Sequence, residues 1–282
     1  MEHSDEDVSP AVLTPWLNEH GVECASWLKS FSSARGDPVP PAHVEELNCL
    51  YAASRVSQLL LTRFQPQRGP FHQGGPHISL ADYADFFSQL GMTLAKPAEY
   101  SPFYHEIVDV IQAPDSMQTP QIVRTMWPCL MLGPMMFSRA GVCISVGDAI
   151  MNKEVAESSL IYWSYLRLNR QYEDLSHGWG SNSQWRTAFR RDYLIEGDFC
   201  LNVDGRCHVS MELEGDEGDF LPLEQRIELV KYHHFVKRNS AIYTEGHPWP
   251  YEYSLRMSGN DPLIVSPLGF AVGTGVAVTP HL

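Results

Sequence analysis

The uncharged apolar stretch Met126–Phe137 is the feature that most limits how this chain can fold. It has twelve residues, whereas a helix that crosses a bilayer needs about 20. Pro128 and Pro134 would break or kink a helix here, and Ser138–Arg139 ends the apolar run. The pattern argues against a membrane protein. It predicts a buried, kinked helical segment whose methionines fill gaps in the core.

Apolar residues recur at helical spacing through the first part of the chain. We expect two short helices on either side of a break at Gly21, and a long amphipathic helix over 43–64. Its apolar positions are Val44, Leu47, Leu50, Tyr51, Val56, Leu59 and Leu60. Another helix should begin at Ser79, whose hydroxyl and the Asp82 carboxylate can cap it, and end at Gly91.

Two further helix starts have proline at the first helical position, where its missing N–H costs nothing. Ser101–Pro102 predicts a short helix over 102–113, with Phe103, Ile107 and Val110 on its apolar face. Thr119–Pro120 predicts the start of the helical segment that continues through the apolar stretch to Gly141.

The pattern changes after Gly141. Val142–Val146 and Leu160–Leu166 are rich in branched and aromatic residues, and 192–203 is typical of a hairpin that turns at Glu196–Asp198. A helix is expected over Pro222–Arg238. Short strands are expected at 251–257, 263–265 and 270–278. The fold class expected is α+β, with a helical N-terminal half packed on a mainly antiparallel C-terminal β-sheet. We expect one compact unit, 1–282, with a boundary near 141 as the alternative.

The charge balance excludes several classes of function. The chain has 20 Lys and Arg against 34 Asp and Glu, a net charge of -14, which repels nucleic acid. The acidic start of the chain lacks the basic and apolar regions of a signal peptide, so a cytoplasmic location and free thiols are expected. No dinucleotide-binding or phosphate-loop motif, no zinc signature and no calcium loop occurs. We therefore expect no cofactor and no metal.

The segment 172–192 has the composition of a ligand-binding loop, because it is poor in core-forming residues and rich in hydrogen-bonding groups and tryptophan. Five arginines lie between 167 and 191 against Glu173 and Asp174, so the local charge is positive. Guanidinium groups suit carboxylate, sulfate or phosphate. The candidate substrate-binding residues are Trp179, Ser181, Asn182, Ser183, Gln184, Trp185, Arg186 and Arg190. Residues 184–194 fit either a helix or, better, a strand that leads into the hairpin.

Two groups are candidates for acid–base chemistry. His177 lies in the loop itself, and an imidazole titrates near neutral pH. On the expected helix over 102–113, His105 and Asp109 are four residues apart, beside Glu106, and together could relay a proton or share a metal. Ordinary solvated polar residues would give the same pattern.

The sequence favours a cofactor-independent enzyme acting on a small anionic molecule. An elimination or cyclisation that expels sulfate or phosphate is its most specific form, because arginines that hold the leaving anion stabilise the transition state. The alternative is a non-catalytic acidic binding protein, of the immunity type, that neutralises a basic partner. We expect no nucleic acid and no membrane partner, while a homo- or hetero-oligomer is possible.

Overall fold

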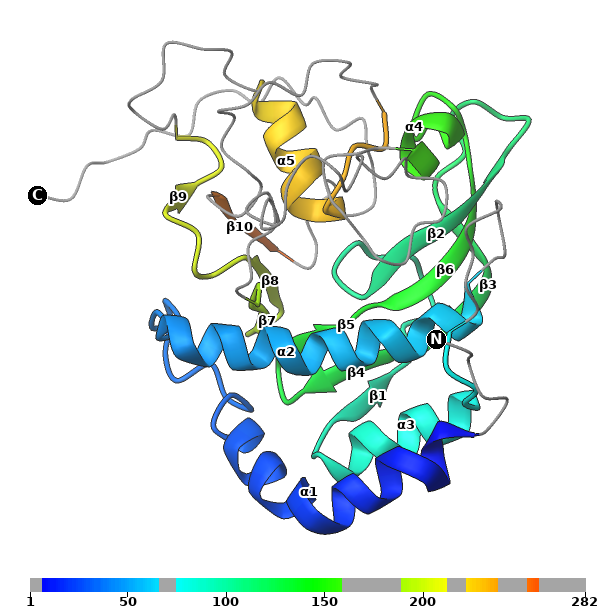
Figure 1. Ribbon diagram of the computed structural model, residues 1–282. Helices are drawn as coiled ribbons and strands as arrows, with labels where there is room; N and C mark the ends of the chain where they lie inside the picture. The colour runs from blue at the N-terminus through cyan, green and yellow to red at the C-terminus, as the bar shows by residue number, and fades with distance from the viewer. Residues whose placement is uncertain (1–6, 66–74, 159–188, 212–221, 238–252, 259–282) are drawn as a thin grey trace, which may run out of the picture.

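The computed structural model describes residues 7–65, 75–158, 189–211, 222–237 and 253–258 (Figure 1). Three long helices come first in the chain and are followed by strands that form two sheets. The sheets are mostly antiparallel, so the α+β class is confirmed. Strands begin at Thr93, however, well before the position near 141 where the pattern predicted them.

The first helices follow the sequence signals closely. A short π-helix, η1 (Ser9–Leu13), leads into α1 (Thr14–Lys29), which continues through Gly21, so the predicted break is wrong. Helix α2 (Val44–Leu61) ends in the single turn η2 (Thr62–Phe64). Helix α3 (Leu80–Gln89) begins as expected, because the Ser79 hydroxyl accepts a hydrogen bond from the Asp82 amide.

The larger sheet has seven strands in the order β1-β4-β5-β7-β8-β10-β9. Their bounds are β1 (Thr93–Ala95), β4 (Cys129–Leu132), β5 (Met135–Ser138), β7 (Asp192–Ile195), β8 (Asp198–Leu201), β9 (Cys207–His208) and β10 (Tyr253–Ser258). All neighbours are antiparallel except β9 and β10. The predicted hairpin is β7–β8, and its turn residues Glu196 and Gly197 both have positive φ, as a tight turn of this kind requires.

The smaller sheet places β6 (Ala140–Val146) between β2 (His105–Gln112) and β3 (Gln121–Trp127). β2 is parallel to β6 and β3 is antiparallel to it. Helix α4 (Lys153–Ser158) packs against β2, and α5 (Leu223–Tyr232) packs against β10. α5 ends earlier than predicted because His233 takes a left-handed conformation, with φ 64°.

The helices predicted over 102–113 and through the apolar stretch are wrong, because both segments form strands. Residues four apart share one face of a strand as well as of a helix, so the spacing of Phe103 and Ile107 fits both structures. Pro128 lies between β3 and β4, and Pro134 lies in the turn between β4 and β5. At these positions proline removes no hydrogen bond from the centre of a strand. The expectation that this stretch is buried is confirmed.

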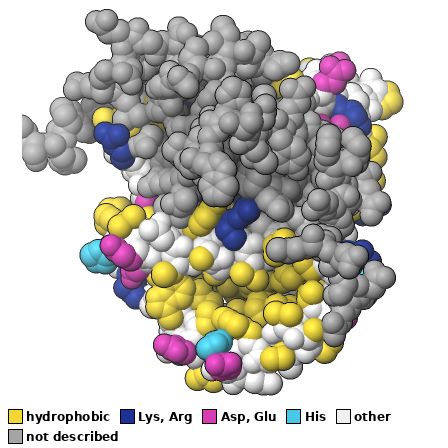
Figure 2. Space-filling model, viewed as in Figure 1, with side chains coloured by type: hydrophobic (Ala, Val, Ile, Leu, Met, Phe, Trp, Pro, Cys, Tyr) yellow, Lys and Arg dark blue, Asp and Glu magenta, His cyan; other side chains and the backbone are white. Residues whose placement is uncertain are grey.

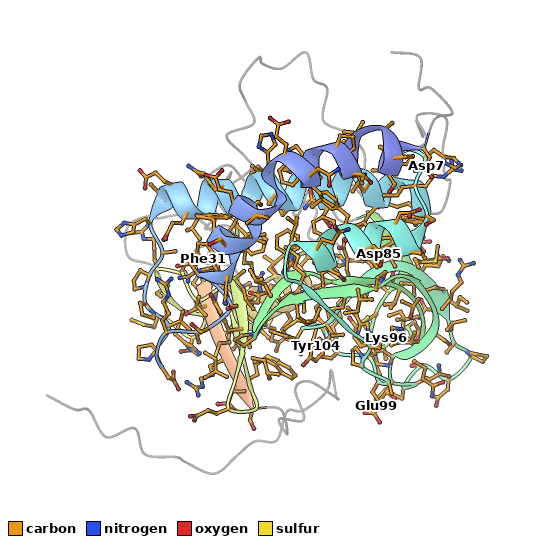
Figure 3. The ribbon with its side chains drawn as sticks, turned by 90° about the horizontal axis from the view of Figure 1, so that it is seen from below. Asp7, Phe31, Asp85, Lys96, Glu99 and Tyr104 are labelled. Atoms are coloured by element: carbon orange, nitrogen blue, oxygen red, sulfur yellow. The ribbon has the colours of Figure 1, made fainter. Side chains whose placement is uncertain are left out.

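The main core lies between the first helices and the larger sheet. In Figure 1, α2 crosses in front of β4 and β5, and α1 and α3 lie below it. Viewed from below, α1 and α2 lie along the same side of the molecule, with the strands beneath them (Figure 3). Among the described residues, no helix has the length and apolar character needed to cross a membrane.

Helix α2 is oriented differently from what its pattern predicted. Its buried positions are Leu47, Leu50, Ser54, Ser57, Leu60 and Leu61. Two of these are serines, and the Ser57 hydroxyl lies 2.8 Å from the Tyr83 hydroxyl, so the polar group is satisfied inside the core. Val44, Val56 and Leu59, which the pattern placed on the core side, are exposed.

Candidate functional site

Among the described residues, a group of buried charges surrounds Asp192, the first residue of β7. Its Oδ1 accepts hydrogen bonds from Arg190 Nε at 2.9 Å and from the Asn202 amide at 2.7 Å. Its Oδ2 accepts one from Arg139 Nη2 at 2.9 Å. All three side chains in these ion pairs are less than a tenth exposed. We call Arg139, Arg190 and Asp192 the Arg–Asp centre, and it carries a net positive charge because two guanidinium groups share one carboxylate.

The backbone of several elements fixes these side chains. Arg139 lies between β5 and β6, its Nε donates to the Phe103 carbonyl at 3.1 Å, and its own carbonyl accepts from Trp127 Nε1 at 2.9 Å. Arg190 Nη2 donates to the Val230 carbonyl of α5. The Arg–Asp centre therefore ties together both sheets and α5.

His233 lies beside the Asp192 carboxylate. It follows α5, and its left-handed backbone turns the chain there. Its Nε2 is 3.9 Å from Asp192 Oδ2, so a protonated His233 would form a third ion pair with the same carboxylate.

His105 lies near the same charges, at the start of β2. The side chain is buried, and its ring stacks on Tyr100 with 5.7 Å between centroids. Its Nδ1 lies 3.0 Å from the Ser101 amide nitrogen and 3.1 Å from the Ser101 carbonyl oxygen. Burial lowers the pKa of His105 and the positive charge of Arg139 lowers it further, while the Ser101 contact opposes both. The ring is therefore neutral at pH 7.

Arg139 is affected by the opposite charges around it. Burial lowers the pKa of its guanidinium, as does the neighbouring Arg190, while Asp192 and Glu106 raise it. An arginine stays protonated in proteins at neutral pH, so its positive charge persists in this buried setting. Glu106 is thus a second carboxylate that acts on the centre.

The structure brings together three of the predicted site residues from separate parts of the sequence. On β2, the charge of Arg139 lowers the pKa of His105, and Glu106 raises the pKa of Arg139. Arg190 and Arg139 both donate to Asp192. The pattern treated the segment 102–113 and the arginine-rich segment as two alternative sites. In the structure, His105 and Glu106 of the first segment and Arg190 of the second lie near one centre.

Asp109 does not join them. Because β2 is a strand and not a helix, residues four apart are separated by about 13 Å, and His105 and Asp109 cannot share one metal ion. Asp109 instead lies beside Cys143, whose Sγ is 3.8 Å from its Oδ2. Within the described ranges, no group of three or more His, Cys, Asp or Glu side chains is placed to hold a metal.

Most of the predicted ligand loop lies outside the described residues. This applies to His177, Trp179, Ser181, Asn182, Ser183, Gln184, Trp185 and Arg186. Of the range 184–194, residues from Asp192 onward form β7, as the strand alternative predicted, and 184–188 lie outside the described part.

The sequence reasoning overlooked Arg139, Asp192 and Asn202. One signal was present: Arg139 is a single charge between two apolar runs, Met135–Phe137 and Ala140–Val146. A charged residue so placed is buried only with a partner. The partner of Arg139 could not be inferred from the neighbouring sequence, because Asp192 lies 53 positions further along the chain.

Comparison of the chain with protein-family models, with curated proteins and with solved structures finds no match.

Proposed function

We propose that this protein is a cofactor-independent enzyme of small-molecule metabolism that binds an anionic substrate at the Arg–Asp centre. The observation that carries the proposal is that two buried guanidinium groups, those of Arg139 and Arg190, donate to the same carboxylate of Asp192. They lie in a chain whose net charge is -14. Their N–H donors outnumber the two oxygens of that carboxylate, and a bound anionic substrate would accept from the remaining donors.

The hydrogen-bonding geometry suits such a ligand. Each guanidinium has five N–H donors, and within the described residues the Nη1 atoms of Arg139 and Arg190 make no hydrogen bond. Planar guanidinium groups hold carboxylate, sulfate and phosphate through paired N–H donors. The fixed contacts of both arginines to Phe103 and Val230 keep these donors in place before a ligand arrives.

His105 is the candidate for proton transfer, with Glu106 beside it. A neutral imidazole can accept a proton at pH 7, and the lowered pKa of His105 keeps it in that form. The most specific reaction would be an elimination or cyclisation in which the base removes a proton while the arginines hold the sulfate or phosphate that leaves. The loop residues from His177 to Arg186 lie shortly before Arg190 in the sequence and remain candidates for the rest of the site.

Calorimetric titration of the full chain with inorganic sulfate and with phosphate tests the anion site. We expect binding to wild type and a loss of about tenfold or more in Arg190→Lys, because an ammonium group cannot reproduce the paired donors. Arg256→Lys is the matched control. Arg256 also contacts two carboxylates, Asp37 and Asp198, but it lies on the exposed surface.

Equal affinity of wild type and Arg190→Lys, in proteins with the same thermal stability, would overturn the anion site. An effect of equal size in Arg256→Lys would show that the arginines act only through the overall charge of the surface. His105→Gln should bind the same anions with nearly wild-type affinity, since its proposed role is to move a proton and not to hold the ligand.

A further inference from the structure

Helix α2 carries a stripe of residues on its outer side that the fold leaves exposed. The apolar members are Cys49, Ala52, Val56 and Leu59, with Val56 and Leu59 42% and 48% exposed. Glu45 lies one turn before them, and Arg63 lies one turn after them in η2, which continues α2; both are exposed. We call Glu45, Cys49, Ala52, Val56, Leu59 and Arg63 the outer stripe.

The spacing of the outer stripe is that of a helix-pairing surface. Its members follow one another at intervals of four, three, four, three and four residues, which keeps them on one line along a helix. The line lies opposite the buried positions of α2, which include Ser54 and Ser57. The helix buries four leucines and two serines on its inner side and still exposes Val56 and Leu59 on its outer side, so it has apolar residues on two sides.

The outer stripe is also symmetric about Ser54. Glu45 and Arg63 lie at equal distances from this residue, as do Cys49 and Leu59, and so do Ala52 and Val56. If a second copy of α2 ran antiparallel across the first, with a twofold axis at Ser54, each residue would meet its counterpart in these pairs. Cys49 would oppose Leu59, and Ala52 would oppose Val56.

We propose that the outer stripe is the interface of a homodimer in which the two α2 helices pair antiparallel. The charges at the two ends of the outer stripe support a second copy of this chain as the partner. In the antiparallel pair Glu45 of each copy meets Arg63 of the other, so the ion pair forms twice. A parallel pair would bring Glu45 against Glu45. The small side chain of Ala52 lets the helices approach closely where Val56 opposes it.

The surroundings of α2 offer further area for this contact. A single helix pair is small compared with the roughly 1,200 Å² or more that stable interfaces bury. Helix α1 lies on the same side of the molecule (Figure 3) and exposes Trp16 and Val22, and the preceding η1 exposes Val12. Figure 2 shows hydrophobic side chains gathered over this region. The interface can therefore extend from α2 onto α1.

The first test is the oligomeric state of the full chain, measured by sedimentation over a series of protein concentrations in the micromolar range. We expect a wild-type dimer and a Val56→Asp monomer, since two carboxylates per dimer would enter the apolar contact. Val123→Asp is the matched control, because Val123 is also an exposed valine, at 54% against 42% for Val56, and lies on β3. A wild-type monomer at every concentration would overturn the proposal, as would a dimer that Val56→Asp leaves intact.

The second test addresses the direction of the helices through their end charges. Glu45→Arg should weaken the dimer by about tenfold or more, because two ion pairs become two repulsions. Adding Arg63→Glu to the same chain should restore the affinity, because the double variant again places opposite charges at each end. A double variant as weak as the single one would overturn the antiparallel arrangement.

The third test fixes the register by disulfide formation in a Cys49→Ser background. Ala52→Cys and Val56→Cys proteins should form an intermolecular disulfide when mixed and oxidised, because these positions oppose each other. Either protein alone should form little. A strong disulfide in Ala52→Cys alone would indicate a parallel pair and overturn the proposed register.

Discussion

Arg139 and Asp192 form an ion pair with 2.9 Å between Nη2 and Oδ2, although 53 positions separate them in the chain. Both side chains are almost fully buried, at 6% and 3% exposed. The pair joins the connection between β5 and β6 to the start of β7. Its buried position makes it both a structural junction and the basis of the proposed anion site.

Asp192→Asn should destabilise the protein strongly. The substitution removes the carboxylate that Arg139 and Arg190 share, and breaking a buried ion pair from one side costs about 3–5 kcal/mol in the free energy of unfolding. Chemical denaturation measures this difference. Asp198→Asn, which alters an exposed contact with Arg256, is the control and should cost much less. Similar losses in the two variants would contradict the structural role of Asp192.

His105 should make the protein less stable as the pH falls. Because its pKa in the folded state lies below the ordinary histidine value of 6.5, the unfolded chain takes up the proton first, and protonation favours unfolding. Between about pH 7.5 and about pH 5, wild type should lose more stability than His105→Gln, which cannot titrate there. Denaturation midpoints of both proteins across this range test the difference. Parallel curves would contradict the expected shift.

Replacing each of two glycines by alanine should change the stability of the protein in opposite directions. In Gly141→Ala the new Cβ would lie 2.3 Å from the Trp127 ring, so we expect a loss of about 1–3 kcal/mol in stability. In Gly21→Ala the nearest atom is the flexible Leu17 side chain at 3.3 Å, and alanine favours a helix interior by up to about 1 kcal/mol. Thermal denaturation of the two variants gives the comparison. A stable Gly141→Ala protein would contradict the close packing of Trp127 on β6.

The cysteines should differ in reactivity in the folded protein. Cys49 is exposed on α2, whereas Cys129 is buried, and burial raises the pKa of the Cys129 thiol to about 12. Because the thiolate is the reactive form, an alkylating reagent should modify Cys49 first and Cys129 only after denaturation. Mass spectrometry of the labelled peptides measures the order. Early labelling of Cys129 would indicate that this part of the core opens readily.

Local signals were sufficient for several elements. The Ser79 cap placed the start of α3, and the turn at Glu196–Gly197 placed the β7–β8 hairpin. The amphipathic pattern over 43–64 predicted α2 and its length, but it put Val56 and Leu59 on the wrong side. These successes share one cause, since a cap or a tight turn depends on residues only a few positions apart.

The failures concern strands that pair over long distances. The spacing of apolar residues over 102–113 fits a helix face and a strand face equally, and only pairing of β2 with β6 selects the strand. The candidate site shows the same limit. His105, Glu106 and Arg190 were identified as individual residues, but their meeting at Arg139 and Asp192 could not be.

The sequence by itself determined the α+β class, the first helices, the β7–β8 hairpin and the burial of the apolar stretch. Only the tertiary structure decided that this stretch forms strands, which side of α2 faces the core, and which carboxylate neutralises Arg139. The physical reason is that a side chain carries its own propensity and charge wherever it lies, whereas its burial and its partner depend on chain segments that folding brings beside it.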